Sequence, residues 1–585
     1  MTVPTPSAGT TSPSPAPAAR RPGGPRARTA LDILADDHLD AMCRLDPVAA
    51  TAEGLLGYAD GVTDHSPAGV AARADLCRRT LGALAGVPVA DDVDAVTAAV
   101  LRERLGLAVA RHDAGLDLAV VGNIASPVQS LREVFDVQPA ATADDVTALL
   151  DRLAGLPRAL DGYREALVAA RAGGWVPTVT GLRTAAVQAD ETAGDSDPDG
   201  SYFAALVRDL PGAPATARAL ADAAAQAFGE LATWLRTDLL PGATPDDACG
   251  RDAYALHLQH HSGDTVDLDE TYAWGLEELA RIEAEMAAVA RGLAPAAPAG
   301  TDPASVAAAI AAGVAALDAD PARDIDGTDA LRTWMQGVSD AAVDALAGTH
   351  FDIPDALRAL VCRIAPSSSG GIYYTSPSED FSRPGQMWWA VPHGVTRFST
   401  WRETSTVYHE GVPGHHLQLG STAYDVERLN RYRRYGVWVS GHGEGWALYA
   451  ERLMAELGFL DDPGDLMGML DAQALRAARV VVDVGVHCRL AAPAEVGGGT
   501  WDGAKVLAFL DAHTRLDPAT TRFEAERYLT WPGQAPSYKI GERTWLALRD
   551  DARRRAGAAF DLAGWHRQAL ALGSVSLDVL RKALS

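Results

Sequence analysis

The stretch YHEGVPGHHLQ, which runs from Tyr408 to Gln418, is the part of the sequence that best indicates fold and chemistry. A histidine–glutamate pair followed by a histidine four places later puts two imidazoles on one helical face, where they can bind zinc. Here the residue four places after His409 is Pro413, and the next histidines are His415 and His416. The stretch therefore has two interpretations, a metal site on an altered helix or a histidine-rich turn.

A straight helix brings neither later histidine to His409. His415 would point about 120° away around the helix axis, and His416 would lie about 10 Å further along it. Pro413 lacks an amide donor and clashes with the preceding turn, while Gly414 tolerates unusual backbone angles. This pair predicts a bulge or kink that returns one of the two histidines to the metal.

The rest of the chain has mainly helical patterning. Residues 142–174 and 267–293 carry apolar side chains every three or four positions, with Thr142 and Asp269 near the predicted N-termini. Two aromatic runs, Ile372–Tyr374 and Met387–Val391, predict short strands just before the histidine stretch. We therefore expect a mainly α fold with a small β-sheet edge near the metal helix.

Charge and cysteine usage exclude several classes of partner. The chain of 585 residues has 77 acidic and 51 basic side chains, a net charge of −26, which disfavours nucleic acids and anionic membranes. Its five cysteines are scattered, which indicates a reducing compartment and no disulfide framework. No apolar run reaches the roughly 18 residues of a membrane span. We therefore expect a cytoplasmic protein, and its oligomeric state stays open.

Composition also predicts the organisation of the chain. Residues 1–29 are rich in Pro, Ala, Ser and Thr and lack an apolar segment, so we expect a disordered tail there. Residues 30–585 are expected to form a single large catalytic domain. Its mainly helical half covers residues 30–360, and its metal-site half covers residues 361–585.

Three stretches carry a family resemblance: HEGVPGHHLQ at 409–418, EGWALYAE at 444–451 and PGQAPSYKIG at 532–541. They resemble domain-of-unknown-function family 885, which groups bacterial zincin-like proteins related to gluzincin metallopeptidases. Gluzincins carry His-Glu-x-Gly-His or His-Glu-x-x-Gly-His, and this chain has one more residue before the glycine. The resemblance implies a large zincin-like helical metallopeptidase fold.

The same resemblance implies a ligand set for one Zn²⁺ ion per chain. It makes His409 and His415 ligands, with His416 as the alternative to His415. It makes Glu444 the third ligand, with Glu451 as the rival. Three protein ligands leave one position open for water, which the ion makes more acidic.

Glu410 follows the first ligand directly and is the expected general base. We therefore expect a zinc-dependent hydrolase that cleaves peptide bonds of oligopeptides, or small amides, with metal-activated water. Two alternatives stay open, a metalloenzyme recruited to small-molecule tailoring and a non-catalytic peptide-binding protein. Glu410 argues against the second, because a binding module does not need this base.

Further candidates lie downstream and upstream of these ligands. Arg479 and His487, with Asp483 between them, share one stripe of a predicted helix, and we expect His487 in catalysis and Arg479 in substrate binding. A salt bridge beside a histidine whose ring nitrogens have hydrogen-bond partners explains this stripe equally well. Tyr538 is a candidate oxyanion donor and Lys539 a candidate partner for a substrate carboxylate.

Two upstream features complete the set of candidates. Tyr373, in the first aromatic run, is a candidate substrate contact, because an edge strand beside a metal helix can bind an extended peptide. A surface hairpin with structural aromatics is an equal alternative. His257, His260 and His261 are close in sequence, but no carboxylate accompanies them at ligand spacing, so we interpret them as structural.

Overall fold

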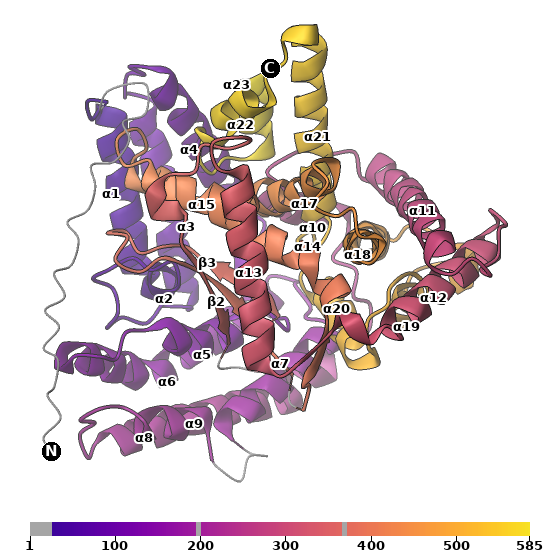
Figure 1. The fold of residues 1–585 in the computed structure, drawn as a ribbon. Coiled ribbons are helices and arrows are strands. Elements are labelled where there is room, and N and C mark those ends of the chain that lie inside the picture. The colour runs from indigo at the N-terminus through magenta and orange to yellow at the C-terminus, as the bar shows by residue number, and fades with distance from the viewer. Residues whose placement is uncertain (1–25, 195–199, 366–370, 393) are drawn as a thin grey trace, which may run out of the picture.

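The computed structural model describes residues 26–194, 200–365, 371–392 and 394–585, which form helices around two large apolar cores and two small sheets (Figure 1). The helices before the main sheet are α1 (Ala30–Leu45), α2 (Pro47–Ala52), α3 (Pro67–Leu84), α4 (Asp92–Asp113), α5 (Pro127–Val137), α6 (Ala143–Ala172), α7 (Val179–Ala193), α8 (Tyr202–Arg208), α9 (Ala217–Trp234), α10 (Arg251–Ser262), α11 (Leu268–Leu293), α12 (Pro303–Asp318) and α13 (Thr328–Leu346). The strands are β1 (Asp324–Asp326), β2 (Leu360–Ile364), β3 (Ile372–Thr375), β4 (Gly385–Trp389) and β5 (Arg397–Ser399). The later helices are α14 (Thr400–Glu410), α15 (His415–Tyr424), α16 (Arg431–Tyr435), α17 (Ser440–Glu456), α18 (Pro463–His487), α19 (Gly503–His513), α20 (Pro518–Thr530), α21 (Ser537–Ala556), α22 (Leu562–Leu570) and α23 (Leu577–Leu584).

The two amphipathic segments form helices that begin where their capping residues predict. Thr142 caps α6, because its hydroxyl accepts from the amide of Asp145 and the Asp145 carboxylate accepts from the amide of Thr142. Asp267 caps α11, and Asp269 lies in its first turn. The prediction of a mainly helical fold is confirmed.

The main sheet lies against the helix that carries His409. Its strand order is β2-β4-β3, with β3 antiparallel and β2 parallel to the central strand β4. The aromatic runs at 372–374 and 387–391 fall in β3 and β4, although β4 ends at Trp389, and β2 was not predicted. Met387 and Trp389 pack with Val407 of α14 in one apolar cluster. β3 is therefore an edge strand, and it lies beside α14.

The larger apolar core joins the first and the last described helices. It contains Leu31 of α1 and Leu584 of α23, together with buried residues of α11, α17 and α18. A second core is formed by the helices from α5 to α9, and it includes Leu153 of α6 and Phe228 of α9. The two predicted halves, 30–360 and 361–585, therefore share the larger core.

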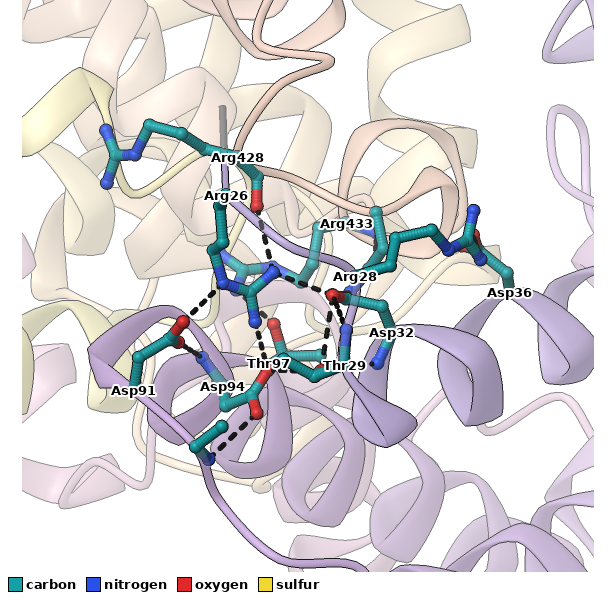
Figure 2. Close-up of polar contacts among 12 residues, drawn as sticks. Arg26, Arg28, Thr29, Asp32, Asp36, Asp91, Asp94, Thr97, Arg428 and Arg433 are labelled. Carbon is teal, nitrogen blue, oxygen red and sulfur yellow. Dashed lines mark hydrogen bonds and ion pairs between the residues drawn. The ribbon is translucent and has the colours of Figure 1, made fainter. Parts of the chain in front are cut away.

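Arg26 ties the beginning of the described chain to the fold (Figure 2). Its guanidinium contacts the carboxylates of Asp32 at 2.7 Å and Asp91 at 2.5 Å, and it also contacts Asp94. It donates to the carbonyl of Arg428 at 3.5 Å, in the segment between α15 and α16. One arginine thus connects α1 and α4 with the half of the molecule that carries the histidine stretch.

This anchor lies within the predicted tail. Residues 1–25 lie outside the described residues, and the disorder expected for them stays a prediction. Residues 26–29 belong to the fold, and Thr29 caps α1 in a capping box with Asp32. Arg26 and Thr29 therefore have specific partners within the predicted tail, and the boundary at residue 29 stays a prediction.

The described helices carry no candidate membrane span. None of them combines the length and the apolar character that crossing a bilayer requires. All five cysteines are free, and four of them are buried. The cytoplasmic location stays a prediction.

Candidate metal centre

The helix of His409 is interrupted where the sequence predicts a break. α14 ends at Glu410 and α15 begins at His415, and the four residues between them form a tight loop. The amide of Gly414 donates to the carbonyl of Tyr408, and the amide of His416 donates to the carbonyl of Gly411, both at 3.1 Å. These bonds replace regular helical bonds between residues four apart. The loop absorbs the extra residues and starts α15 at His415.

Gly414 is required for this loop. A Cβ atom at this position would lie 1.9 Å from the carbonyl oxygen of His409, so no other residue fits without a shift of the backbone. On the other side of the loop, the indole of Trp446 on α17 donates to the carbonyl of Pro413 at 2.8 Å. The loop is therefore fixed both by its own backbone and by the helix that carries Glu444.

His409, His415 and Glu444, which we call the metal group, converge on one point. Their ligand atoms all lie within 4.8 Å of one another. Nε2 of His409 and Nε2 of His415 lie 3.2 and 3.5 Å from the same carboxylate oxygen of Glu444. The two imidazole rings are 4.9 Å apart and almost perpendicular, at 87°. The bulge therefore brings together three side chains that a straight helix would keep apart.

The chemistry of this group fits a zinc ion. Two imidazole nitrogens and one carboxylate are a common donor set for catalytic zinc, and such a site keeps one position open. Within the described parts of the chain, no other trio of His, Cys, Asp or Glu side chains meets the same spacing. The geometry favours His415 over His416 and Glu444 over Glu451 as ligands.

Glu451 lies behind the first ligand and contacts its other nitrogen. Its carboxylate is 2.7 Å from Nδ1 of His409 and almost completely buried. Burial lowers the pKa of His409, but hydrogen bonds to Glu444 and Glu451 outweigh it and raise the pKa to about 10. A carboxylate on the distal nitrogen fixes the ring and its tautomer for metal binding. Glu451 thus fixes the orientation of the His409 ring from the side opposite Glu444.

Glu410 is buried next to the metal group without a complete set of partners. Its Oε2 atom has no hydrogen-bond partner although it is inaccessible to solvent. Burial raises the pKa of this carboxyl, and the charges of His409 and His415 oppose that effect. A carboxylate with free hydrogen-bonding capacity beside a metal group can accept a proton from water.

His416 faces away from the metal group. Its Nδ1 lies 3.0 Å from the hydroxyl of Tyr374 on β3, and its Nε2 donates to the carbonyl of Leu357 at 2.9 Å. Burial lowers the pKa of this imidazole to about 4. His416 therefore joins α15 to the sheet, and the structure gives no support to it as the alternative ligand.

Arg479 belongs to a buried polar network with α20. Its guanidinium donates to the hydroxyl of Tyr528 and to the carboxylate of Glu524, both at 2.8 Å, and Tyr528 also contacts Glu524. The same guanidinium lies over the ring of Tyr538, 5.0 Å from its centre. Because Arg479 already has an ionic partner, the structure provides no free guanidinium there for a substrate. Tyr538 is half-buried at the start of α21.

Lys539 does not face an open site. Its ammonium is buried and contacts the carboxylates of Glu278 at 2.8 Å and Glu542, and it donates to the amide oxygen of Gln473 at 2.9 Å. Three acceptors match the three donors of the ammonium group. The expectation that Lys539 binds a substrate carboxylate is therefore not supported, because protein carboxylates occupy it.

His487 is likewise held by its neighbours. Its Nε2 donates to the carbonyl of Tyr528 at 2.8 Å, and its Nδ1 accepts from the amide of Cys249 at 3.4 Å. Burial lowers its pKa to about 4. Asp483 contacts neither His487 nor Arg479, and accepts instead from the hydroxyl of Tyr254 at 2.7 Å. The structure therefore favours the structural interpretation of this helical stripe over the catalytic one.

Tyr373 lies on the exposed side of the edge strand. The residue is 38% exposed, and its ring stacks on Trp388 of β4, with ring centres 6.2 Å apart. β3 packs against α14 as well as against β4. Tyr373 thus remains available to an extended chain that pairs with β3.

Trp438 is a residue at the metal group that sequence reasoning missed. It lies just before α17, is 47% exposed, and has its ring 6.1 Å from the ring of His415. A Cβ atom at Gly443 would lie 2.3 Å from this indole, so the glycine before Glu444 makes room for it. The glycines on both sides of Glu444 are the one sequence signal that could have indicated this close packing.

The second histidine group has protein partners. Nδ1 of His257 lies 3.1 Å from the guanidinium of Arg111. The rings of His260 and His261 contact each other edge to face, and His261 packs on Trp531. This arrangement agrees with the structural interpretation of these three histidines.

Comparison with solved structures identifies two similar folds. A candidate lipoprotein from Colwellia psychrerythraea is 22% identical and superposes with a TM-score of 0.78, over 95% of this chain and 98% of that one. A candidate lipoprotein of unknown function from Shewanella oneidensis is 16% identical and superposes with a TM-score of 0.73, over 95% and 99% of the two chains. At these identities the likeness shows the fold alone.

Comparison with sequences identifies the family. No curated protein matches the chain. Residues 47–584 match the family described as "Bacterial protein of unknown function (DUF885)". Because this match covers almost the whole sequence, including every residue of the metal group, the chain belongs to the DUF885 family.

Proposed function

We propose that this member of the DUF885 family is a zinc-dependent hydrolase that cleaves the peptide bonds of oligopeptides. The observation that carries the proposal is the convergence of His409, His415 and Glu444 on one point, directly beside the unpartnered carboxyl of Glu410. A structural role does not require a buried carboxylate with an unused oxygen next to three ligand atoms. A zincin-like character of the fold is part of this proposal.

The protein groups divide the chemistry between them. A zinc ion held by the metal group supplies Lewis acidity toward water and toward a substrate carbonyl. Glu410 takes the proton of the attacking water and transfers it to the amine that leaves, while the carbonyl carbon gains the hydroxyl group and loses the nitrogen. Glu451 holds the ring of His409 in position for this arrangement.

The surroundings of the metal group supply contacts for a peptide. β3 is an edge strand beside α14, so an extended chain can pair with its free backbone groups next to Tyr373. Trp438 offers an exposed apolar ring beside His415 for a substrate side chain. The phenol of Tyr538 is the donor that we assign to the oxyanion. The expected partner is therefore a peptide or small amide, not a nucleic acid or a membrane.

Metal content tests this proposal first. Elemental mass spectrometry of the purified protein should find about one zinc per chain in the wild type and less than about a tenth of that in His409→Ala, His415→Ala and Glu444→Ala. His416→Ala is the matched control, because this histidine adjoins a ligand but faces the sheet, and it should keep its zinc. Circular dichroism would establish that all variants are folded.

Turnover is tested next, with a peptide-library digest by the wild type and by Glu410→Gln. Cleavage by the wild type and not by the variant supports the proposal. A wild type without metal, or zinc retained in all four variants, would overturn it. Bound iron in place of zinc would favour small-molecule tailoring, and bound zinc with no cleavage would favour a peptide-binding protein.

A further inference from the structure

Arg476 lies on the face of α18 that meets the first turn of α21. Gln473, one turn earlier, accepts from the ammonium of Lys539 at 2.9 Å, and Arg479, one turn later, lies over the ring of Tyr538. Residues three apart on a helix share a face. The two contacts therefore bracket Arg476 beside the start of α21.

The start of α21 also adjoins the helix that carries Glu444. The hydroxyls of Ser440 and Ser537, the first residues of α17 and α21, lie 2.8 Å apart. Glu444 follows one turn after Ser440. α14, α17 and α18 pack against one another at the centre of the fold (Figure 1). Arg476 consequently lies on a helix that packs against α14 and α17, which carry His409 and Glu444.

The guanidinium of Arg476 has no carboxylate partner. Its Nε is inaccessible to solvent and has no hydrogen-bond acceptor, and within the described residues no acidic oxygen lies within 4.0 Å of it. Asp471, on the same helix, pairs with Arg515 at 2.6 Å; burial raises the pKa of Asp471, and the charge of Arg476 is one of those that oppose this effect without an ion pair. Arg479, the next arginine on α18, pairs with Glu524. In a chain with 77 acidic and 51 basic side chains, an unpaired and partly buried arginine is an unusual arrangement.

Arg476 is separate from the metal group and from the candidate base. Its guanidinium forms no ion pair within 4.0 Å with Glu410 or with Glu444, whose carboxylate contacts His409 and His415 instead. This is the placement expected for a group that holds a substrate at a distance from the bond that is cleaved.

We propose that Arg476 binds the free α-carboxylate of a peptide's C-terminal residue, so that the substrates are peptides cleaved at their C-terminal end. The inference rests on the proposed hydrolase function and names its substrate class. A guanidinium forms two parallel, charge-assisted hydrogen bonds with a carboxylate, and a peptide carboxamide cannot reproduce them. The unpaired donors of Arg476 are then satisfied by the substrate.

Binding measurements test this inference without turnover. The protein carrying Glu410→Gln, loaded with zinc, is titrated calorimetrically with N-benzoylglycyl-phenylalanine and with its C-terminal carboxamide. The acid should bind at least about tenfold more tightly than the amide. Adding Arg476→Gln should remove this preference by weakening the acid alone, and Arg476→Lys should restore part of it. Arg332→Gln, at an exposed arginine of α13, is the matched control and should change neither affinity.

The outcomes separate the inference from the function on which it rests. Equal binding of acid and amide, no binding of either at millimolar concentration, or an acid preference that survives Arg476→Gln would overturn the role of Arg476. Failure of the wild type to hold zinc or to hydrolyse any peptide would overturn the hydrolase function. An acid preference that depends on Arg476 would still stand in that case as a carboxylate-binding site. Zinc content should be equal in all the arginine variants, which excludes an effect through the metal.

Discussion

Two buried polar regions of this molecule use the same kinds of side chain but differ in how completely these are paired. In the metal group and its base, Nδ1 of His415 and Oε2 of Glu410 have no partner. In the network of α18, α20 and α21, Arg479, His487 and Lys539 each contact groups that satisfy them. Both regions looked functional in the sequence. The difference teaches that, among the side chains singled out in the sequence, unmet hydrogen-bonding capacity rather than residue type marks His415 and Glu410, although Asp483 and Gln473 of the network also keep one unpartnered atom each.

The largest effect that would test this comparison is expected at Lys539. Replacing Lys539 with Met leaves the buried carboxylate of Glu542 without its close cation, while Glu278 keeps its pairing with Arg281, so the free energy of unfolding should fall by about 3–5 kcal/mol. The zinc content of the folded protein should not change. Urea unfolding and elemental analysis measure the two quantities. Lys582→Met, at an exposed lysine, should change stability by less than about 1 kcal/mol. An unchanged stability with weaker peptide binding would restore the substrate-binding role.

His487 should make stability depend on pH. Its pKa is about 4 in the folded protein and 6.5 in the reference state, because burial disfavours the charged ring. The unfolded chain therefore binds a proton that the folded protein excludes. The stability present above pH 6.5 should decrease as the pH falls towards 4, by about 3 kcal/mol in total from this residue.

The measurement is urea unfolding of the wild type and of His487→Gln at a series of pH values between about 7 and about 4.5. Other buried histidines contribute in both proteins, so the difference between the two slopes reports His487. A variant with the slope of the wild type would show that this ring is not held neutral, contrary to the structural interpretation. A structural histidine should also leave the pH profile of peptide hydrolysis unchanged.

A substitution at Gly414 tests whether the bulge between α14 and α15 is needed for zinc binding. A methyl group there would meet the carbonyl of His409 at 1.9 Å, so Gly414→Ala should displace His415 and abolish zinc binding. The accompanying loss of stability should be about 1–3 kcal/mol. Gly337→Ala in α13 is the control, since a Cβ there meets nothing within 4 Å, and it should stabilise the protein by about 0.5–1 kcal/mol. A Gly414→Ala protein that keeps its zinc would disprove the need for this bulge.

Local chemistry explains what the sequence could predict. The interruption after Glu410 follows from the backbone restrictions of Pro413 and Gly414, and β3 and β4 follow from their aromatic runs. β2 was missed because a short apolar run is not diagnostic without its neighbours. The helical class and the family were both predicted correctly, because each is indicated by local sequence patterns.

Tertiary contacts explain what the sequence could not predict. Lys539 was assigned to a substrate because its partner Glu278 lies far away in the sequence. Asp483 finds its partner Tyr254 on α10, more than two hundred residues earlier. Trp438 and Arg476 were overlooked because only the packed structure shows one ring exposed beside a ligand and one guanidinium without an acid. Pairing and exposure are properties of the fold, and no motif spacing reports them.

The smallest effect is expected for a substitution at Glu451. It separates the interpretation of Glu451 as a group that orients His409 from its interpretation as a zinc ligand. Replacing Glu451 with Gln keeps the shape but removes the charge behind His409, so zinc affinity should fall by about 10–100-fold, as measured by competition with a chelator of known affinity. Glu456→Gln, on the same helix and paired with Arg549 at the surface, should leave the affinity unchanged. Complete loss of zinc would instead make Glu451 a ligand, as the rival assignment holds. An unchanged affinity would place this buried carboxylate with the structural network, because its charge would then serve the fold and not the metal.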